Sequence, residues 1–288
     1  MEQVLRWVSE QTGSDVATVT PLRGGWTAEM RRVRLADGRD VVVRSFVTEF
    51  FRRHAEGLLE REAGMLRALA DVDSIPAPRL LAVDSTGRYG EAPSLVMSML
   101  PGAVDVHTDR SAQLAGQLVA IHRVQVDPRP REFQVWVSPG TVRVPAATNR
   151  PQVWTQAVEI IARELPPYDG VLLHRDFHPG NVLFDGDQVS GVVDWVETSW
   201  GPADLDVAHC STALALLHGP EVGVRFADQY VAAGGQLSED LRHWQVLDAL
   251  GFAPDAEKVA GPWRELGRID LTSGVLQDRL EHYLQQVL

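Results

Sequence analysis

The sequence contains little lysine, little cysteine and no long apolar run. Lys258 is its only lysine, so any task that usually needs a lysine must fall to arginine. Its one cysteine, Cys210, excludes an internal disulfide and a cysteine-based metal site, and we expect a small buried residue on a helix. No apolar run approaches the ~18 residues of a membrane span, and the first residues lack the pattern of a signal peptide. These absences predict a cytoplasmic protein with no membrane partner.

The charge balance and the size exclude further classes of protein. Lysine and arginine together number 27 against 39 aspartates and glutamates, which gives a formal net charge of −12. Such an acidic chain is poorly suited to non-specific binding of nucleic acid, which needs a basic surface. With 288 residues, 44% of them hydrophobic and 23% charged, the composition is typical of a globular protein. The chain is long enough for one large domain or two lobes.

The first hundred residues predict a small lobe rich in β-strands. An amphipathic helix is expected at 2–12, and a second at 53–70, where leucines are spaced for one buried face. Asp37-Gly38 is a hairpin signal between two of the expected strands. The strands are expected at 17–22, 30–35, 40–46, 79–84 and 94–99.

Pro101-Gly102 is a natural joint, after which the pattern becomes mostly helical. A loop with several prolines and little periodicity is expected at 126–150. Helices are expected at 110–124, 151–164, 203–217, 220–233, 238–250 and 272–286, and short strands at 182–184 and 189–193. We therefore predict an α+β fold with a small β-rich N-terminal lobe over residues 1–100 and a larger helical C-terminal lobe over residues 101–288.

One stretch of the C-terminal lobe carries the residue types that phosphoryl transfer needs. His174-x-Asp176 is followed five residues later by Asn181, and Asp194 comes thirteen residues after that. The transfer requires a carboxylate to orient the acceptor hydroxyl and take its proton, together with oxygen ligands for magnesium. Asp176 and Asn181 would supply a base and a carbonyl oxygen on one loop. The hairpin expected next would return the chain, so that Asp194 adds a second metal ligand.

This stretch resembles the catalytic loop and the metal-binding aspartate of the eukaryotic-like kinases. Its details look most like the aminoglycoside phosphotransferase family, also called the phosphotransferase enzyme family. The marks are His-Pro-Gly-Asn at 178–181, Asp-Trp at 194–195 and Gly-Pro-Ala-Asp-Leu-Asp-Val-Ala at 201–208. The resemblance implies a bilobal, protein-kinase-like fold. It also implies an enzyme that uses ATP and magnesium to phosphorylate a hydroxyl of a small molecule.

Carried over position by position, the resemblance implies a role for each residue of the motif. Asp176 would be the catalytic base, and Asn181 and Asp194 would hold magnesium. His174 would fix the loop. Asp206 would be a buried acceptor for backbone amides of that loop, and the alternative for it is a charge at a helix N-terminus.

The N-terminal lobe would bind the nucleotide. A pair of glycines lies between the first two strands, where kinase-like folds place a loop that covers the phosphates. The candidate phosphate-covering residues are Gly24, Gly25, Trp26 and Thr27. Backbone groups at the end of the fifth strand would read the base, and the sequence leaves ATP and GTP open. The candidate base-reading residues are Ser98, Met99 and Leu100.

Arg44 ends a run of valines on the third strand, where kinases have a lysine that pairs with the α- and β-phosphates. No lysine is available in this lobe, so Arg44 would take the role with a planar fork of donors in place of an ammonium group. Glu62 on the following helix is the best candidate for its partner, and Glu60 and Glu56 are alternatives. The competing interpretation is a surface arginine on an edge strand.

The sequence says less about the acceptor side. The loop 126–150, with Phe133 and Trp136, and the segment 251–265 are candidate walls of the acceptor pocket. Carboxylates there would suit the ammonium groups of an aminoglycoside, and tryptophans such as Trp244 could stack on a substrate or belong to the core. The candidate substrate residues are His178, Glu197, Asp255, Glu257 and Trp263. Monomer and homodimer both stay open.

Several functions stay open as well. A small-molecule kinase is favoured, with an aminoglycoside or another antibiotic as acceptor. A metabolic kinase would instead use an amino sugar, choline or homoserine. A nucleotide-binding pseudokinase would account for the missing lysine. A protein kinase would need Asp-Phe-Gly, Ala-Pro-Glu and an activation segment, which the sequence lacks. A metal-dependent hydrolase built on His174, Asp176 and His178 lacks a second histidine pair.

Overall fold

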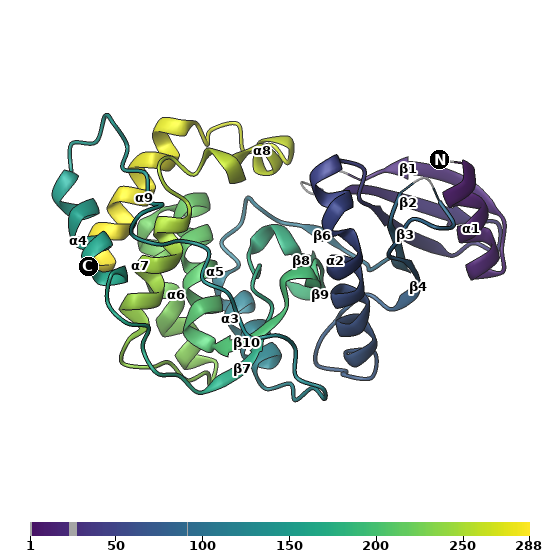
Figure 1. Cartoon of the computed structure of the whole chain (residues 1–288), viewed down its shortest axis with the longest axis horizontal. Coiled ribbons are helices and arrows are strands. Elements are labelled where there is room, and N and C mark those ends of the chain that lie inside the picture. Colours follow the sequence, from purple (N-terminus) through teal and green to yellow (C-terminus); the bar gives the residue numbers. More distant parts are fainter. Residues whose placement is uncertain (1, 23–27, 91) are drawn as a thin grey trace. The chain divides into compact units, whose positions relative to one another are not determined.

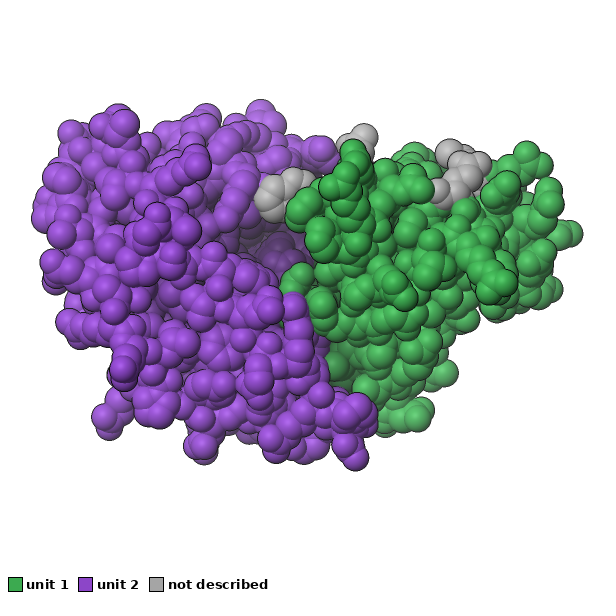
Figure 2. Space-filling view, in the orientation of Figure 1, with its two compact units in different colours: residues 1–103, 183–197 green, residues 104–182, 198–288 purple. Residues whose placement is uncertain are grey.

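The computed structural model shows two compact units, which Figure 2 distinguishes by colour. The residues with a described structure are 2–22, 28–90 and 92–288. Unit 1 consists of residues 1–103 and 183–197, and unit 2 of residues 104–182 and 198–288. The chain therefore passes between the units three times, whereas lobes over 1–100 and 101–288 would be joined by a single crossing. The segment 183–197 accounts for the difference.

Unit 1 is built on a five-stranded antiparallel sheet (Figure 1). The strands are β1 (Val16–Pro21), β2 (Glu29–Leu35), β3 (Asp40–Ser45), β4 (Leu80–Asp84) and β5 (Ser94–Ser98). Their order across the sheet is β1-β2-β3-β5-β4, so β3 is the middle strand and pairs with β2 on one side and with β5 on the other. Arg44 near the end of β3 therefore lies on a central strand, and the alternative of an edge-strand surface arginine is wrong.

Two helices cover the strands of unit 1. α1 (Glu2–Thr12) buries Trp7 and Val8 in one core with the sheet, because apolar side chains recur on one face of the helix. α2 (Glu49–Ala68) contacts β4 and β5, and Leu59 is fully buried on its inner face. α2 thus follows β3 directly and places its inner face beside the sheet.

A hairpin from the middle of the chain completes unit 1. Its strands and their neighbour are β8 (Val182–Asp185), β9 (Gln188–Val192) and β6 (Ala103–Val104), in the order β6-β8-β9. The amide of Val192 donates to the carbonyl of Pro76 at 2.9 Å, and the hydroxyl of Ser190 donates to the carbonyl of Pro101 at 2.8 Å. The one-turn helix η2 (Trp195–Glu197) follows and contacts α2. These bonds explain why the hairpin belongs to unit 1.

Unit 2 is mostly helical (Figure 1). Its helices are α3 (Ser111–His122), α4 (Pro151–Ile161), α5 (Ala203–His218), α6 (Pro220–Ala232), α7 (Leu241–Gly251), α8 (Glu257–Glu265) and α9 (Ser273–Val287). α5 is buried from Ala203 to Leu217 and contacts α6, α7 and α9. Because α5 is buried on every side, other elements must cover it on every side, and α5 is therefore the centre of the unit. Trp244 and Trp263 lie in the same core, and Phe133 packs against it.

Two short strands position the loop that carries the candidate catalytic motif, which begins at His174. β7 (Gly170–Leu173) pairs antiparallel with β10 (Ser199–Pro202). The motif begins directly after β7, and β10 leads directly into α5. The first turn of α5 and the start of the motif therefore lie beside each other.

The predicted helices and strands are confirmed in type, with ends that differ by a few residues. The largest difference is at α2, which begins at Glu49 rather than at residue 53. α8, β6, β7 and β10 were not predicted, because the strands are short and α8 contains Gly261 and Pro262, which weaken a helical pattern. Cys210 is fully buried on α5, as expected. Among the described residues, no helix has the length and apolar character that crossing a bilayer demands.

Candidate active site

Asp206 fixes the start of the candidate catalytic loop of unit 2. It lies in the first turn of α5 and is fully buried. Its Oδ2 accepts the amide of His174 at 2.7 Å, and its Oδ1 accepts the amide of Arg175 at 2.9 Å. Burial alone would raise the pKa of Asp206, but the hydrogen bond from His122 and nearby positive charges lower it below its ordinary value. An ionised, buried carboxylate thus determines where the loop leaves β7.

Arg175 turns the chain just before Asp176. Its φ of +72° is rare for a residue with a side chain, and such strain persists only where the surroundings hold it. The guanidinium carbon lies 4.0 Å from the ring centroid of Trp136, and Nη2 donates to the carbonyl of Gln134 at 3.2 Å. Trp136, a candidate pocket wall, therefore packs on Arg175 and holds it from the loop 126–150.

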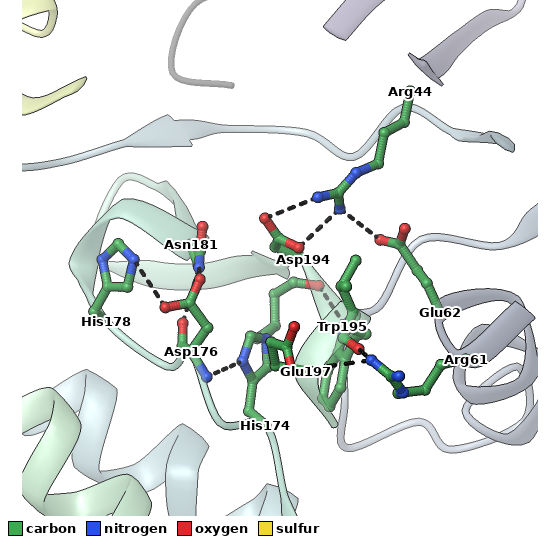
Figure 3. A network of polar contacts seen from close by, with 12 residues as sticks. Arg44, Arg61, Glu62, His174, Asp176, His178, Asn181, Asp194, Trp195 and Glu197 are labelled. Atoms are coloured by element: carbon green, nitrogen blue, oxygen red, sulfur yellow. Dashed lines mark hydrogen bonds and ion pairs between the residues drawn. The ribbon is translucent and has the colours of Figure 1, made fainter. Parts of the chain in front are cut away.

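Asp176 and Asn181 are joined by two hydrogen bonds (Figure 3). Nδ2 of Asn181 donates to the backbone oxygen of Asp176 at 2.8 Å and to its Oδ2 at 2.9 Å. The one-turn helix η1 (Pro179–Asn181) returns the chain so that these groups meet. The amide of Asp176 also donates to Nδ1 of the buried His174 at 3.3 Å. Because Asn181 gives its nitrogen to Asp176, its side-chain oxygen is the atom available for a metal ion.

His178 lies beside the same carboxylate (Figure 3). Its Nδ1 accepts the amide of Gly180 at 3.0 Å, so the ring hydrogen lies on Nε2, 3.8 Å from Oδ1 of Asp176. The ring meets those of His209 and Trp263 edge-on, with centroid distances of 5.9 and 6.4 Å. Asp176 therefore has the His178 imidazole beside it, and the indole ring of Trp263 packs on that imidazole.

His209 is a neighbour of Asp176 that the sequence analysis did not select. It lies on α5 with Nε2 3.3 Å from Oδ1 of Asp176 and Nδ1 3.0 Å from Oδ1 of Asp248 on α7. The sequence feature that could have identified His209 is its position three residues after Asp206, which puts both residues on one face of α5. Nothing in the sequence indicates that α7 brings Asp248 to the same ring.

These neighbours determine the charges around Asp176. Burial would raise the pKa of its carboxyl group, yet the hydrogen bond from His209 and the charges of the surrounding imidazoles hold the pKa well below its usual range. Burial would lower the pKa of His209, but Asp248 and Asp176 raise it to about 10. At neutral pH Asp176 is therefore a carboxylate and His209 an imidazolium.

In unit 1, Arg44 joins two carboxylates (Figure 3). The arginine is buried, and its Nη1 lies 3.1 Å from Oε1 of Glu62 on α2 and 2.8 Å from Oδ1 of Asp194. Its Nη2 also donates to Oδ2 of Asp194 at 3.4 Å. The structure thus brings together Arg44 and its expected partner Glu62, and adds Asp194. The planar fork of the guanidinium makes contact with both acids.

The burial of this cluster changes the acidity of its members. Burial raises the pKa of Glu62 to about 7, against the opposing effect of the Arg44 charge. Burial would lower the pKa of Arg44, but Asp194 and Glu62 raise it far above its usual value. The arginine is therefore charged at every pH at which the protein is folded.

Asp194 follows β9 in a conformation that non-glycine residues rarely adopt, with φ of +66°. Its side chain is 33% exposed, whereas the next residue, Trp195, is fully buried. The indole nitrogen of Trp195 donates to the carbonyl of Val192 at 2.9 Å, which anchors the segment. Glu197 at the end of η2 lies 3.9 Å from Nη1 of Arg61 and so has an ion-pair partner on α2.

The predicted base-reading segment is partly engaged in the sheet. The amide of Ser98 donates to the carbonyl of Arg79 at 2.9 Å, and the amide of Met99 donates to the carbonyl of Asp40 at 3.4 Å. A base bound here would use the carbonyl oxygens or the amide of Leu100. The predicted phosphate-covering residues Gly24, Gly25, Trp26 and Thr27 lie outside the described residues.

The candidate acidic residues of the acceptor side have partners within unit 2. Both oxygens of Glu257 contact the guanidinium of Arg264, and one also accepts the hydroxyl of Ser273 at 2.7 Å. Asp255 accepts the amide of Glu257 at 3.1 Å and so caps the start of α8. Trp263 on the same helix is buried in the core. These contacts stabilise α8.

Asn181 and Asp194 offer the donor atoms that magnesium prefers. Among the residues that the structure describes, no cluster of three or more histidine, cysteine, aspartate or glutamate side chains is placed to hold a metal ion. Magnesium does not need such a cluster, since it binds through one or two carboxylates, keeps several waters and shares phosphate oxygens. An amide oxygen and a carboxylate therefore fit this ion.

Comparison with known protein families identifies the class. The model of the phosphotransferase enzyme family matches residues 18–250, which is most of the chain. The chain belongs to the phosphotransferase enzyme family. The enzyme class predicted from the sequence, a phosphotransferase, is thereby confirmed. No curated protein sequence matches this phosphotransferase.

Solved structures resemble the phosphotransferase over nearly its whole length. The aminoglycoside phosphotransferase APH(4)-Ia has a TM-score of 0.66 at 18% identity, covering 99% of this chain and 98% of that one. Macrolide 2'-phosphotransferase MphH from Brachybacterium faecium has a TM-score of 0.60 at 16% identity, with 97% and 98% covered. Amicoumacin kinase hAmiN has a TM-score of 0.63 at 12% identity, with 99% and 93% covered. At these identities the likeness establishes the fold, and the predicted kinase-like α+β fold is confirmed.

Proposed function

We propose that this phosphotransferase transfers the γ-phosphate of ATP, with Mg²⁺, onto a hydroxyl group of a small molecule. In this proposal residues 1–100 bind the nucleotide, and residues 101–288 supply the catalytic loop and the acceptor site. Similar structures are named for action on an aminoglycoside, a macrolide and amicoumacin, which supports an antibiotic as the acceptor. One of them was solved with AMP-PNP and Ca²⁺, which supports the use of a nucleotide and a divalent ion.

The observation that carries the proposal is the fixed, ionised carboxylate of Asp176. In phosphoryl transfer little covalent chemistry is left to the protein, so catalysis depends on position and charge. The loop is tied to Asp206 at its start, and Asn181 holds Oδ2 of Asp176 at 2.9 Å. Asp176 would orient the acceptor hydroxyl and take its proton as the new bond to phosphorus forms.

The other residues would bind the nucleotide and its metal ion. The side-chain oxygen of Asn181 and the carboxylate of Asp194 would hold Mg²⁺. Bound there, the ion would offset the negative charge on the phosphate oxygens. Arg44 would contact the phosphates in the place of the usual lysine, and Glu62 would hold the guanidinium in position, as supported by their 3.1 Å ion pair.

Release of ADP from MgATP, or of GDP from MgGTP, tests the proposal. The acceptors would be aminoglycosides, macrolides, amicoumacin-type antibiotics, choline, homoserine and amino sugars. We expect one acceptor class to raise the rate above the acceptor-free level. In that reaction Asp176→Ala should lower kcat by about 10²- to 10⁴-fold, the usual contribution of a general base. Asp185→Ala, an exposed aspartate in the β8–β9 hairpin, is the matched control and should leave kcat unchanged.

Three results would separate the alternatives. Full activity of the Asp176→Ala enzyme would remove Asp176 from the mechanism. Tight ATP binding without phosphate transfer to any acceptor, equal in the wild type and in Asp176→Ala, would instead indicate a pseudokinase. Raised drug tolerance of a host that expresses the chain would distinguish an antibiotic acceptor from a metabolite.

A further inference from the structure

The proposed reaction does not account for the second partner of His209. The histidine lies between Asp176 on the catalytic loop and Asp248 on α7, at 3.3 and 3.0 Å. Its side chain is 11% exposed and that of Asp248 is 9% exposed, so both are shielded from bulk water. Removing a histidine and an aspartate from water costs solvation free energy, so their burial needs a reason in folding or in function.

The partners of the ring determine its charge. Each ring nitrogen of His209 faces a carboxylate oxygen, and an ionised carboxylate only accepts hydrogen bonds. A neutral imidazole has one N–H and would turn the lone pair of its other nitrogen toward a negative charge. An imidazolium donates from both nitrogens. The geometry therefore requires the charged form of His209.

Both oxygens of Asp176 are then held. Nε2 of His209 faces Oδ1, and Nδ2 of Asn181 donates to Oδ2. A rotation of the carboxylate about its bond to the side-chain CH₂ group would break both contacts together. Phe252 packs on the His209 ring at a centroid distance of 5.7 Å and an interplanar angle of 31°, which limits movement of the ring itself.

We propose that His209, held by Asp248, is a positioning residue that fixes the carboxylate of Asp176 in the orientation required by the acceptor hydroxyl. The inference rests on the proposed function, in which Asp176 is the base. His209 acts through Asp176 and touches neither acceptor nor nucleotide in this scheme. Neighbours that hold a catalytic group in its reactive geometry raise the rate, because displacing that group by about 1 Å can lower the rate about 100-fold.

Three substitutions test the inference. His209→Phe keeps a ring but removes both donors, and we expect kcat to fall about 10- to 100-fold, with the KM for ATP changed less than about twofold. His209→Gln keeps one N–H toward Asp176 and should recover part of the loss. Asp248→Asn keeps the shape of its side chain but removes the charge that holds the imidazolium. His218→Gln is the matched control, because it lies on the same helix about 13 Å further along the axis.

The pH profile adds a readout that a purely structural role would not change. In the wild type, His209 should not titrate in kcat between about pH 6.5 and 9. In Asp248→Asn it should lose its proton within that range, so kcat should fall as the pH rises. The charged and titratable groups that face the ring are Asp176 and His178 of the loop and Asp248 of α7. Lys258 of α8 and Tyr283 of α9 lie near Asp248. The double variant with His209→Gln should lose this titration and so assign it to His209.

A spectroscopic test does not depend on the acceptor. In ¹⁵N NMR of the wild type at pH 8, both ring nitrogens of His209 should be protonated, and a neutral ring would overturn the inference. Wild-type kcat in His209→Phe alongside an inactive Asp176→Ala would overturn it while leaving the proposed function intact. Full activity of Asp176→Ala would instead refute the proposed role of the base. If the thermal midpoint of His209→Phe is lowered, the kcat and KM criteria are applied to His209→Gln and Asp248→Asn instead.

Discussion

In each unit of the protein, a cation that contacts a candidate site residue lies between two carboxylates, and the two cations differ in kind. In unit 1 the three residues are Glu62, Arg44 and Asp194, and in unit 2 they are Asp176, His209 and Asp248. The guanidinium keeps its charge at any pH that a folded protein meets. The imidazolium has its charge because two carboxylates raise its pKa to about 10. The cation of the first cluster is thus permanent, and the cation of the second depends on pH and on its neighbours.

The difference indicates what each cluster does. Arg44 is buried with Glu62 and offsets negative charge that would otherwise be costly in the interior. His209 contributes a charge directed at one oxygen of Asp176, the proposed base. We therefore expect removal of the arginine to affect stability most, and removal of the histidine to affect turnover and its pH dependence.

The largest effect is expected for Arg44→Met, which keeps much of the side-chain length and removes the charge. Glu62 would be left buried without a cation, so the free energy of unfolding should fall by about 3–5 kcal/mol. Urea denaturation measures this loss. Arg44→Lys should recover part of it, since an ammonium group is charged but lacks the planar fork. Arg34→Met on the exposed side of β2 is the control, and an equal loss in both methionine variants would contradict the comparison.

A smaller effect is expected from the titration of His209. Its folded pKa of about 10 lies above the ordinary 6.5, so its stabilising contribution is complete below about pH 6.5 and is lost as the pH rises towards 10. The difference in free energy of unfolding between the wild type and His209→Gln should shrink over this range by on the order of 2 kcal/mol. Urea unfolding at several pH values measures the change. The difference for Arg44→Met should instead grow as the pH rises, because Glu62, whose pKa is about 7 beside Arg44, must ionise without a cation in the variant. A difference that shrinks for both variants would remove the distinction drawn here.

The smallest effect is expected where an exposed ring covers a buried cation. Trp136 is 57% exposed and covers the guanidinium of the buried Arg175 at 4.0 Å. Trp136→Ala should lower the free energy of unfolding by about 0.5–1 kcal/mol, the usual size of a cation–π contact with an exposed partner. Val135→Ala, a neighbouring exposed position, should change it less. Equal losses of unfolding free energy in the two variants would show that the Trp136 ring adds nothing to stability.

The part of the candidate site that is local in sequence could be predicted. Asp176 and Asn181 lie five residues apart on one loop, and a hairpin of known type follows them. The pair of Arg44 and Glu62 joins a strand to the helix that comes directly after it. In both cases short connections bring together neighbouring elements, so the chain order limits the arrangements that are open.

The part that depends on helix packing could not be predicted. His209 and Asp248 are 39 residues apart, and they meet because α5 and α7 are neighbours in unit 2. Glu257 was proposed for the acceptor side, but α8 was not foreseen, and this helix brings Arg264 to the glutamate after seven residues. The hydrophobic pattern predicts that a helix buries one face, but not which other helix covers that face.

The arginine at the end of β3 also has a consequence for chemical labelling of the protein. Guanidinium groups are not nucleophiles near neutral pH, so reagents that acylate the corresponding lysine of kinases would find no side-chain amine in unit 1. Lys258 on α8 is the only side-chain amine of the chain, and burial lowers its pKa and so increases its reactive, neutral form. An amine-directed fluorophore would therefore attach at one side-chain position, and its signal would report on α8.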